Sequence, residues 1–192
     1  MMTPKRMFDL CFSIILLVAL SPLLALIAFL VSLTSPGPVI FRHRRVGYRG
    51  TVFIMLKFRS MKNGSGRHTD HVARGDNRVT PLGRFLRSTH LDELPQLWNV
   101  VWGEMSLVGP RPISPGWNAK WELEIPNYQK RLEIMPGMTG LAQIRRRPER
   151  AVRGEYRKLY LFDVFYARHQ CFWLDLRILL KTLPVMLKRQ GV

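Results

Sequence analysis

Two adjacent acidic residues, Asp92 and Glu93, lie in the segment whose residue types are best suited to chemistry, Leu91-Asp-Glu-Leu-Pro-Gln-Leu-Trp-Asn-Val100. Neighbouring side chains on a helix point about 100° apart, so the two carboxylates would not work as a matched acid and base. One of them can attack a substrate or bind a metal ion while the other reaches a different group. The alternative is structural, because acidic residues just before a proline often cap a helix and favour its dipole.

Three basic residues stand in polar or turn-flanked motifs elsewhere in the chain: Lys57, Arg87 and Arg111. Arginine clamps phosphate oxygens with two parallel hydrogen bonds, lysine supplies a point charge, and carboxylates hold Mg²⁺. Together with Asp92 and Glu93 they would suit a site that handles phosphate groups. Each basic residue taken singly is more often a solvated surface charge, so the combination carries the prediction.

Composition narrows the class of protein that could hold such a site. The 192 residues include 30 Lys and Arg against 13 Asp and Glu, a formal charge of +17, and 47% of them are hydrophobic. A disordered basic tail is excluded, and the length suits one domain. The charge predicts an anionic partner: nucleic acid, an anionic membrane face or a phosphorylated substrate. With only two cysteines, the chain has no disulfide framework or Cys-rich metal site.

An apolar run from Leu10 to Leu33 would form a helix of about 36 Å, long enough to cross a hydrocarbon core of about 30 Å. Ser21 and Pro22 interrupt it at the middle. Pro22 has no N–H for the Val18 carbonyl, so a kink is expected, and the Ser21 hydroxyl could bond back to Leu17.

Basic residues flank this run on both sides, and the positive-inside rule favours a helix that enters the membrane, breaks at Ser21-Pro22 and returns, because both flanks then stay cytoplasmic. A kinked spanning anchor and a cleaved signal peptide are the alternatives. The flanking residues are Lys5 and Arg6 before the run, and Arg42, Arg44, Arg45 and Arg49 after it.

The rest of the chain reads as a mostly helical α+β domain, with a membrane segment over residues 1–36 and a catalytic domain over residues 37–192. The expected elements are a β-hairpin with strands at 39–41 and 51–56 around a basic turn at 42–50, a helix at 81–103, a loop at 104–112, a helix from Trp117 to Met135 broken near Pro126, and a helix at 151–165.

Residues 172–190 have the pattern of a basic amphipathic helix, typical of helices that rest at a lipid headgroup boundary. Packing of this helix on the domain's own core is the alternative. A nucleic-acid partner is disfavoured, because no zinc finger or RNA-binding aromatic signature accompanies the basic residues. The basic face carries Arg177, Lys181 and Lys188, and the apolar face carries Trp173, Leu176, Leu180, Leu183 and Leu187.

Ordered motifs along most of the chain resemble those of the bacterial sugar transferases, also called monotopic phosphoglycosyl transferases. The matching pieces are Lys5-Arg-Met-Phe-Asp9, Ser21-Pro22, Arg45-Val-Gly47, Lys57-Phe-Arg-Ser-Met61, Leu91-Asp-Glu-Leu94, Gln96-Leu-Trp-Asn99, Met105-Ser-Leu-Val-Gly-Pro-Arg-Pro112, Pro136-Gly-Met-Thr-Gly140, Ala142-Gln143, Phe162-Asp-Val-Phe-Tyr166 and Leu174-Asp-Leu176.

The resemblance implies an enzyme that moves a phosphosugar from a UDP-sugar to undecaprenyl phosphate and releases UMP. It would rest on inner-membrane lipids at the cytoplasmic face of a bacterial cell. Asp92 would attack the β-phosphorus and help to bind Mg²⁺, and Glu93 would support metal binding or proton handling. Substrate phosphates would be held at basic family positions, and the expected binding residues are Lys57, Arg87, Arg111, Gln143 and Arg147.

The chain departs from the family pattern at two places. Leu141 replaces the usual Trp, and Ile144-Arg-Arg-Arg147 stands where Val-Asn-Gly-Arg is common, so that only Arg147 matches and the sugar stays open. Because Met1 lies four residues before Lys5, we expect the small, single-domain form. A membrane-tethered nucleic-acid-binding protein and a scaffold for glycosyltransferases are the alternative functions, and the oligomeric state is not predicted.

Overall fold

The computed structural model describes residues 2–64, 76–145 and 153–187. It is mostly helical with two small sheets, which confirms the α+β prediction at that level. Arg147 and Lys188 lie outside the described residues. The elements are α1 (Pro4–Ala19), α2 (Ser21–Thr34), β1 (Ile40–Val46), η1 (Tyr48–Gly50), β2 (Val52–Phe58), α3 (Pro81–Thr89), η2 (Leu91–Glu93), α4 (Gln96–Trp102), β3 (Ser106–Val108), α5 (Pro115–Glu124), η3 (Tyr128–Leu132), β4 (Gly137–Thr139), α6 (Leu141–Arg145), α7 (Arg153–His169) and α8 (Phe172–Leu187).

Helices α1 and α2 form a pair that bends by 64° at the predicted break. The Ser21 hydroxyl donates to the Val18 carbonyl at 2.8 Å, not to Leu17 as the sequence predicted. This is the carbonyl that the missing N–H of Pro22 leaves free, so the serine repairs the gap that the proline makes. In the described part of the chain, no helix alone has the length and apolar composition to cross a bilayer, but the bent pair together does.

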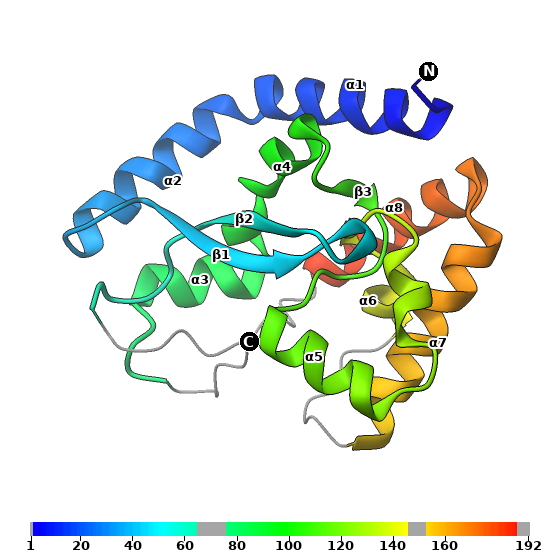
Figure 1. Cartoon of the computed structure of the whole chain (residues 1–192). Coiled ribbons are helices and arrows are strands. Elements are labelled where there is room, and N and C mark those ends of the chain that lie inside the picture. Colours follow the sequence, from blue (N-terminus) through cyan, green and yellow to red (C-terminus); the bar gives the residue numbers. More distant parts are fainter. Residues whose placement is uncertain (1, 65–75, 146–152, 188–192) are drawn as a thin grey trace.

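Both helices of the pair lie across the same side of the domain (Figure 1). Leu17 of α1 belongs to the central core together with Val100 and Met105, while Ile27 and Val31 of α2 belong to a second core. The opposite faces of the two helices are apolar and exposed; they include Ile14, Ile15, Val18, Leu26, Phe29 and Leu33.

Strands β1 and β2 form the predicted antiparallel hairpin, with Val46 paired to Val52 near the turn and Ile40 paired to Phe58 at the far end. The predicted turn at residues 42–50 is too long, because β1 continues to Val46. Arg42 and Arg44 occupy the exposed alternate positions of a strand, where charged side chains meet water without breaking the ladder.

The single helix predicted for residues 81–103 is wrong in its continuity. Helix α3 ends at His90, which adopts the left-handed conformation with φ of 59°. The chain reverses there and continues as the short 3₁₀ turn η2 before α4 begins. Leu82, Leu86 and Leu97 keep helical spacing on both sides of the break, so periodicity alone does not reveal it.

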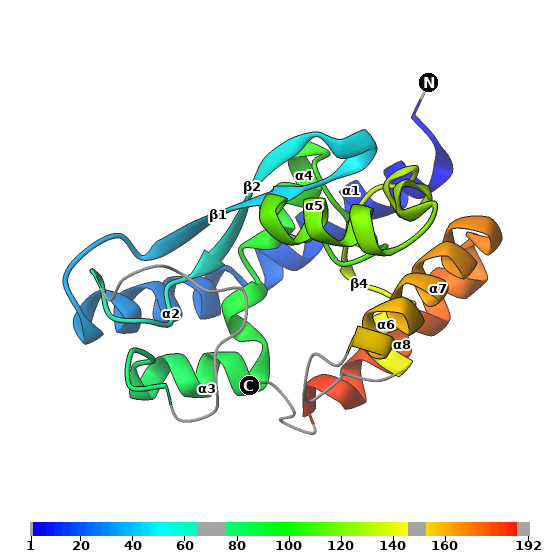
Figure 2. The same cartoon turned by 60° about the horizontal axis from the view of Figure 1, so that its bottom comes forward.

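The segment predicted as a loop, residues 104–112, contains the short strand β3, which pairs in parallel with β4. The last helix, α8, contacts the core through Asp175 and Ile178, which confirms the alternative of packing on the domain. Figure 2 shows α8 with α6 and α7 on one side of the molecule. Trp173, Leu180 and Leu183 are more than half exposed, so an apolar face is left over.

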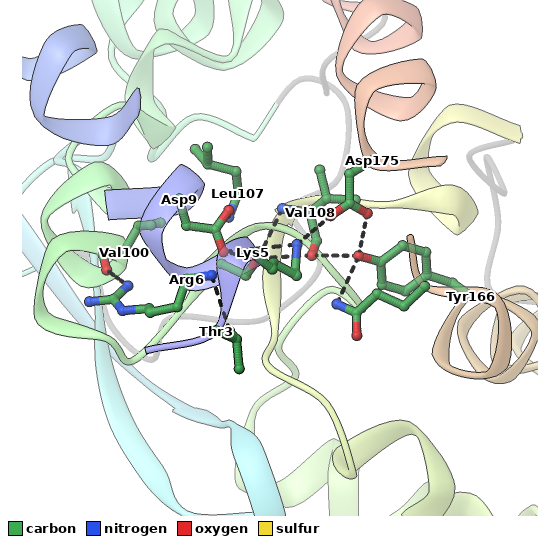
Figure 3. A network of polar contacts seen from close by, with 11 residues as sticks. Thr3, Lys5, Arg6, Asp9, Val100, Leu107, Val108, Tyr166 and Asp175 are labelled. Carbon is green, nitrogen blue, oxygen red and sulfur yellow. Dashed lines mark hydrogen bonds and ion pairs between the residues drawn. The ribbon is translucent and has the colours of Figure 1, made fainter. Parts of the chain in front are cut away.

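A network of charged groups ties α1 to distant parts of the chain (Figure 3). Lys5 Nζ lies 2.6 Å from Asp175 of α8, and the Tyr166 hydroxyl of α7 is 2.6 Å from the same carboxylate. Asp9 accepts a hydrogen bond from Ser106 Oγ of β3 at 2.7 Å. The N-terminal lysine therefore binds a protein carboxylate, in addition to contributing to the basic flank.

Two arginines cap helix ends and fasten the helix pair to the domain. Arg6 of α1 donates to the carbonyls of Val100 and Val101 at the end of α4. Gly103, with φ of 85°, leaves room for this guanidinium, since a Cβ there would lie 3.2 Å from Arg6 Nη2. Arg59, beyond β2, donates to carbonyls at the end of α2, including Val31 at 3.3 Å. A cation at a helix C-terminus also favours the helix dipole.

Candidate active site

Asp92 and Glu93 lie on the 3₁₀ turn η2, between the reversal at His90 and the start of α4. Asp92 is only 6% exposed. Gly83 lets α3 approach the chain after β2, because a Cβ there would lie 2.0 Å from the Ser60 carbonyl oxygen. The local fold thus holds the two carboxylates beside the end of the hairpin.

Strand β2 brings Lys57 to Glu93 because α4 fixes the strand by its backbone. Asn99, fully buried on α4, accepts a hydrogen bond from the Leu56 N–H at 3.0 Å and donates to the Ile54 carbonyl at 2.7 Å. The side chain thereby pairs with the strand as a neighbouring strand would. Lys57 follows directly, and its Nζ donates to Glu93 Oε1 at 2.7 Å.

Arg111 approaches Glu93 with two nitrogens. Its Nη2 lies 2.6 Å from Oε1 and its Nη1 lies 3.2 Å from Oε2. Burial by itself would raise the pKa of Glu93, but Arg111 and Lys57 outweigh it and hold that pKa well below its usual range. Glu93 is therefore ionised, and both of its oxygens are engaged by cations.

Asp92 has the opposite environment. Burial raises its pKa to about 6; Lys57, Arg87 and Arg111 oppose the rise, and Glu93 adds to it. Within the described residues its carboxylate accepts no hydrogen bond. Its oxygens are thus available to an incoming group, and the surrounding positive charge would attract an anionic one.

Among the predicted binding residues, Arg87 belongs to this site and Gln143 does not join it. Arg87 Nε donates to Ser60 Oγ at 2.7 Å, and its charge acts on Asp92. The Gln143 amide donates to the Met138 carbonyl at 3.5 Å, and within the described chain it makes no hydrogen bond to Asp92 or Glu93. Arg147 lies outside the described residues.

Sequence reasoning missed three buried polar residues: Asn99, which holds β2, and Arg59 and Arg131, which donate to backbone carbonyls of other segments. Asn99 stands among apolar residues in Leu97-Trp-Asn-Val-Val101. Because a buried amide needs hydrogen-bond partners, this isolated Asn could have predicted a structural contact with another segment. The two arginines carry no such signal, because arginine is usually exposed.

The family resemblance predicts Mg²⁺ at Asp92, and the residues around it offer few metal ligands. No group of three potential ligands of the His, Cys, Asp or Glu type occurs in the described ranges. Glu93 has no free oxygen, but Asp92 does. Magnesium is commonly held by one or two carboxylates together with substrate phosphates, so Asp92 fits as a single protein ligand that needs the substrate to complete the site.

Residues 1–189 of the chain match a family described as Bacterial sugar transferase. The chain is 40% identical over 190 residues to the UDP-glucose:undecaprenyl-phosphate glucose-1-phosphate transferase of Caulobacter vibrioides, covering 95% of this chain and 69% of that protein. It is 39% identical over 203 residues to the undecaprenyl-phosphate galactose phosphotransferase of Salmonella typhimurium, covering 97% of this chain and 41% of the other.

A third relative, the UDP-N-acetylgalactosamine-undecaprenyl-phosphate N-acetylgalactosaminephosphotransferase of Aeromonas hydrophila, is 39% identical over 188 residues, which cover 97% of this chain and 44% of that protein. The chain thus spans less than half the length of two of these relatives. These three relatives are named for three different sugars at nearly equal identity, so overall similarity does not single out one of them.

Proposed function

Since this chain belongs to the bacterial sugar transferase family, we propose that it transfers a sugar 1-phosphate from a UDP-sugar to undecaprenyl phosphate and releases UMP, as the first membrane step of polysaccharide assembly. The relatives named above support these substrates. The observation that carries the proposal is the buried carboxylate of Asp92, which accepts no hydrogen bond from the residues that the structure describes and lies near Lys57, Arg87 and Arg111. A nucleophile for phosphorus needs this combination of a free carboxylate and nearby cations.

In the first step, an Asp92 carboxylate oxygen attacks the β-phosphorus of the UDP-sugar. A bond forms between this oxygen and phosphorus, and the bond between that phosphorus and the oxygen bridging to the α-phosphate breaks. UMP leaves with the electron pair of the broken bond. The pKa of about 6 means that Asp92 is ionised at neutral pH and carries its nucleophilic lone pair without a separate base.

The cations would hold the diphosphate while charge moves onto the leaving UMP. Lys57 has three N–H donors and Arg111 has five, and each uses only part of its set on Glu93. Glu93 keeps the two cations in place before the substrate arrives, so little reorganisation is needed during the reaction. This role differs from the metal binding or proton handling that the sequence left open for Glu93.

In the second step, an oxygen of undecaprenyl phosphate attacks the phosphorus held on Asp92. The bond between Asp92 and phosphorus breaks, the carboxylate is regenerated, and the lipid diphosphate sugar forms. UMP leaves before the second substrate reacts, so ping-pong kinetics are expected. When bound, Mg²⁺ would neutralise charge on the diphosphate, and Asp92 with the substrate phosphates would hold it.

For the membrane, we propose that α1 and α2 form a re-entrant segment at the cytoplasmic face of the inner membrane, corresponding to residues 1–36, and that residues 37–192 form the catalytic domain. Both helices pack on the same domain, and their outward faces are apolar. A straight crossing would carry one helix away from these contacts. The exposed Trp173, Leu180 and Leu183 of α8 would rest at the same lipid surface.

The topology is tested by labelling single cysteines at Met2 and Arg49, both exposed, after the native Cys11 and Cys171 are replaced by serine. A membrane-impermeant maleimide applied to intact spheroplasts should label neither position until the membrane is opened. Labelling of Met2 alone from outside would establish a spanning helix instead.

The reaction is tested by measuring UMP release from detergent-purified protein with undecaprenyl phosphate, Mg²⁺ and UDP-glucose, UDP-galactose or UDP-N-acetylgalactosamine. Wild type is expected to release UMP with at least one donor, and Asp92→Asn should release none while remaining folded and membrane-bound. Glu122→Gln, which removes an exposed carboxylate on α5, is the matched control. Near-normal release by Asp92→Asn would refute the assignment of the nucleophile.

A further inference from the structure

A second ionic pair, Arg131 and Asp163, lies fully inside the domain behind Arg111. Arg131 is 4% exposed and Asp163 is 6% exposed. Arg131 Nε donates to Asp163 Oδ2 at 2.9 Å, and Nη1 donates to the Tyr128 hydroxyl at 3.0 Å. Its Nη2 donates to the backbone carbonyl of Arg111 at 2.8 Å. One guanidinium therefore joins η3, α7 and the loop that carries Arg111.

Burial of such a pair is weak evidence for stability, because desolvation of both charges often cancels their attraction. Well-packed apolar residues would fill the same space without that cost. What apolar residues could not supply is a donor aimed at the Arg111 carbonyl, fixed in direction by two further hydrogen bonds. The contact that sets this pair apart is therefore the hydrogen bond from Arg131 to the loop that carries Arg111.

Arg111 needs such an anchor on its backbone. Its side chain is 43% exposed, and both Arg111 and Arg131 border a small, partly open pocket. Pro110 and Pro112 restrict the dihedral angles of the loop, but neither can donate a backbone hydrogen bond. Backbone bonds hold the loop on either side of Arg111, because the Pro110 carbonyl accepts from the Gly137 N–H at 2.9 Å and the Ile113 carbonyl accepts from the Val46 N–H at 2.8 Å. Between them, the carbonyl of Arg111 itself is held by the Arg131 guanidinium.

We propose that Arg131, oriented by Asp163, is a positioning residue that fixes the backbone of Arg111 and so keeps its guanidinium on Glu93. This role rests on the proposed function, and it adds two buried residues, Arg131 and Asp163, to the residues that support the site. The order of contacts is Asp163 to Arg131, Arg131 to the Arg111 carbonyl, Arg111 to Glu93, and Glu93 to Lys57. Loss of Arg131 moves Arg111 away from the reacting phosphate, although neither Arg131 nor Asp163 touches substrate.

The test uses Arg131→Lys, which keeps the charge beside Asp163 but cannot direct donors along three lines. We expect kcat to fall about tenfold with a smaller change in KM, because a small displacement of a catalytic cation acts on the transition state. Tyr160→Phe is the matched control. It removes a hydroxyl that donates to the Asn127 carbonyl in the same part of the domain, leaves every bond of Arg131, and should keep kcat within about twofold.

A double-mutant cycle separates positioning from a general effect on folding. If Arg131 acts through Arg111, Arg131→Lys should change kcat by less than about twofold when Arg111 is already alanine. An equal fall of kcat in both backgrounds would overturn the proposal, as would a fall in Tyr160→Phe as large as in Arg131→Lys. Release of UMP by wild type, run alongside, reports on the proposed function itself.

An experimental structure of the Arg131→Lys variant gives a readout that does not depend on turnover. The two hydrogen bonds between Arg111 and Glu93 are expected to be lost or reduced to one. If both bonds persist with unchanged geometry, Arg131 does not position Arg111, whatever reaction the enzyme catalyses. If wild type releases no UMP but the bonds are lost in the variant, the proposed function fails while the positioning role stands.

Discussion

Replacing Asp92 with asparagine should abolish turnover and at the same time stabilise the fold. Burial raises the pKa of Asp92 from its ordinary 3.8 to about 6, so the folded protein binds this proton more tightly than the unfolded chain does. Above about pH 6 the ionised carboxylate opposes folding, and this opposition disappears as the pH falls toward 3.8. Asparagine resembles the protonated acid in shape and charge, and it avoids the effect at every pH.

The magnitude follows from the two pKa values. Their difference corresponds to about 3 kcal/mol at 1.36 kcal/mol for each pH unit, which Asp92→Asn should recover at neutral pH. For a chain of this size, 1 kcal/mol moves the melting temperature by about 2–4 °C, so an increase of about 6–12 °C is expected. Stability of this kind is commonly given up at active sites.

The assay is thermal unfolding followed by tryptophan fluorescence in detergent, with EDTA present and the pH varied from neutral to acid. The advantage of Asp92→Asn over wild type should shrink below about pH 6 and vanish near pH 4. The exposed Glu122→Gln variant should unfold with wild type throughout. Equal or lower stability of Asp92→Asn at neutral pH, or a gain that does not change with pH, would refute the argument from burial.

Three further predictions concern the same site. The rate at which the phosphosugar intermediate forms on Asp92 should fall as the pH drops through about 6, because the carboxylate becomes protonated. Single-turnover UMP release measures this rate. A flat profile between neutral pH and about 5 would contradict the assignment of Asp92 as the nucleophile. Glu93→Gln should destabilise the fold by about 1–3 kcal/mol, since it leaves Lys57 and Arg111 unpaired in a partly buried place. Because the folded pKa of Glu93 is depressed, this loss should be constant at neutral pH and diminish only as the pH falls below 4.5, as thermal unfolding would show. EDTA should stop UMP release, and added Mg²⁺ should restore it with no change in the melting temperature of the substrate-free protein, because Asp92 alone is a weak ligand.

The features that the sequence predicted correctly depend on local chemistry. The bend at Ser21-Pro22 follows from a missing N–H, and the hairpin follows from apolar segments on either side of a Gly-containing turn. The gathering of Lys57, Arg111 and the carboxylates was inferred from motifs and not from geometry. The structure brings these residues together.

The features that the sequence could not predict depend on contacts between distant segments. The reversal at His90 requires a left-handed residue that is not glycine, and helical periodicity continues on both sides of it. Arg59 and Arg131 are buried because carbonyls and a carboxylate from other segments surround them. Apolar periodicity along the chain does not distinguish these arginines from the exposed ones.

The two adjacent carboxylates differ in pKa because one of them takes the fixed partners. Lys57 and Arg111 are both bonded to Glu93, and burial therefore acts on Asp92 with less compensation. If the cations were bonded to Asp92, its pKa would fall and its oxygens would be occupied, which would make it a poorer nucleophile. In the proposed reaction, Glu93 would keep the cations close to Asp92 without letting them bind it. Substrate phosphates would then share Lys57 and Arg111 while Asp92 stays free to attack.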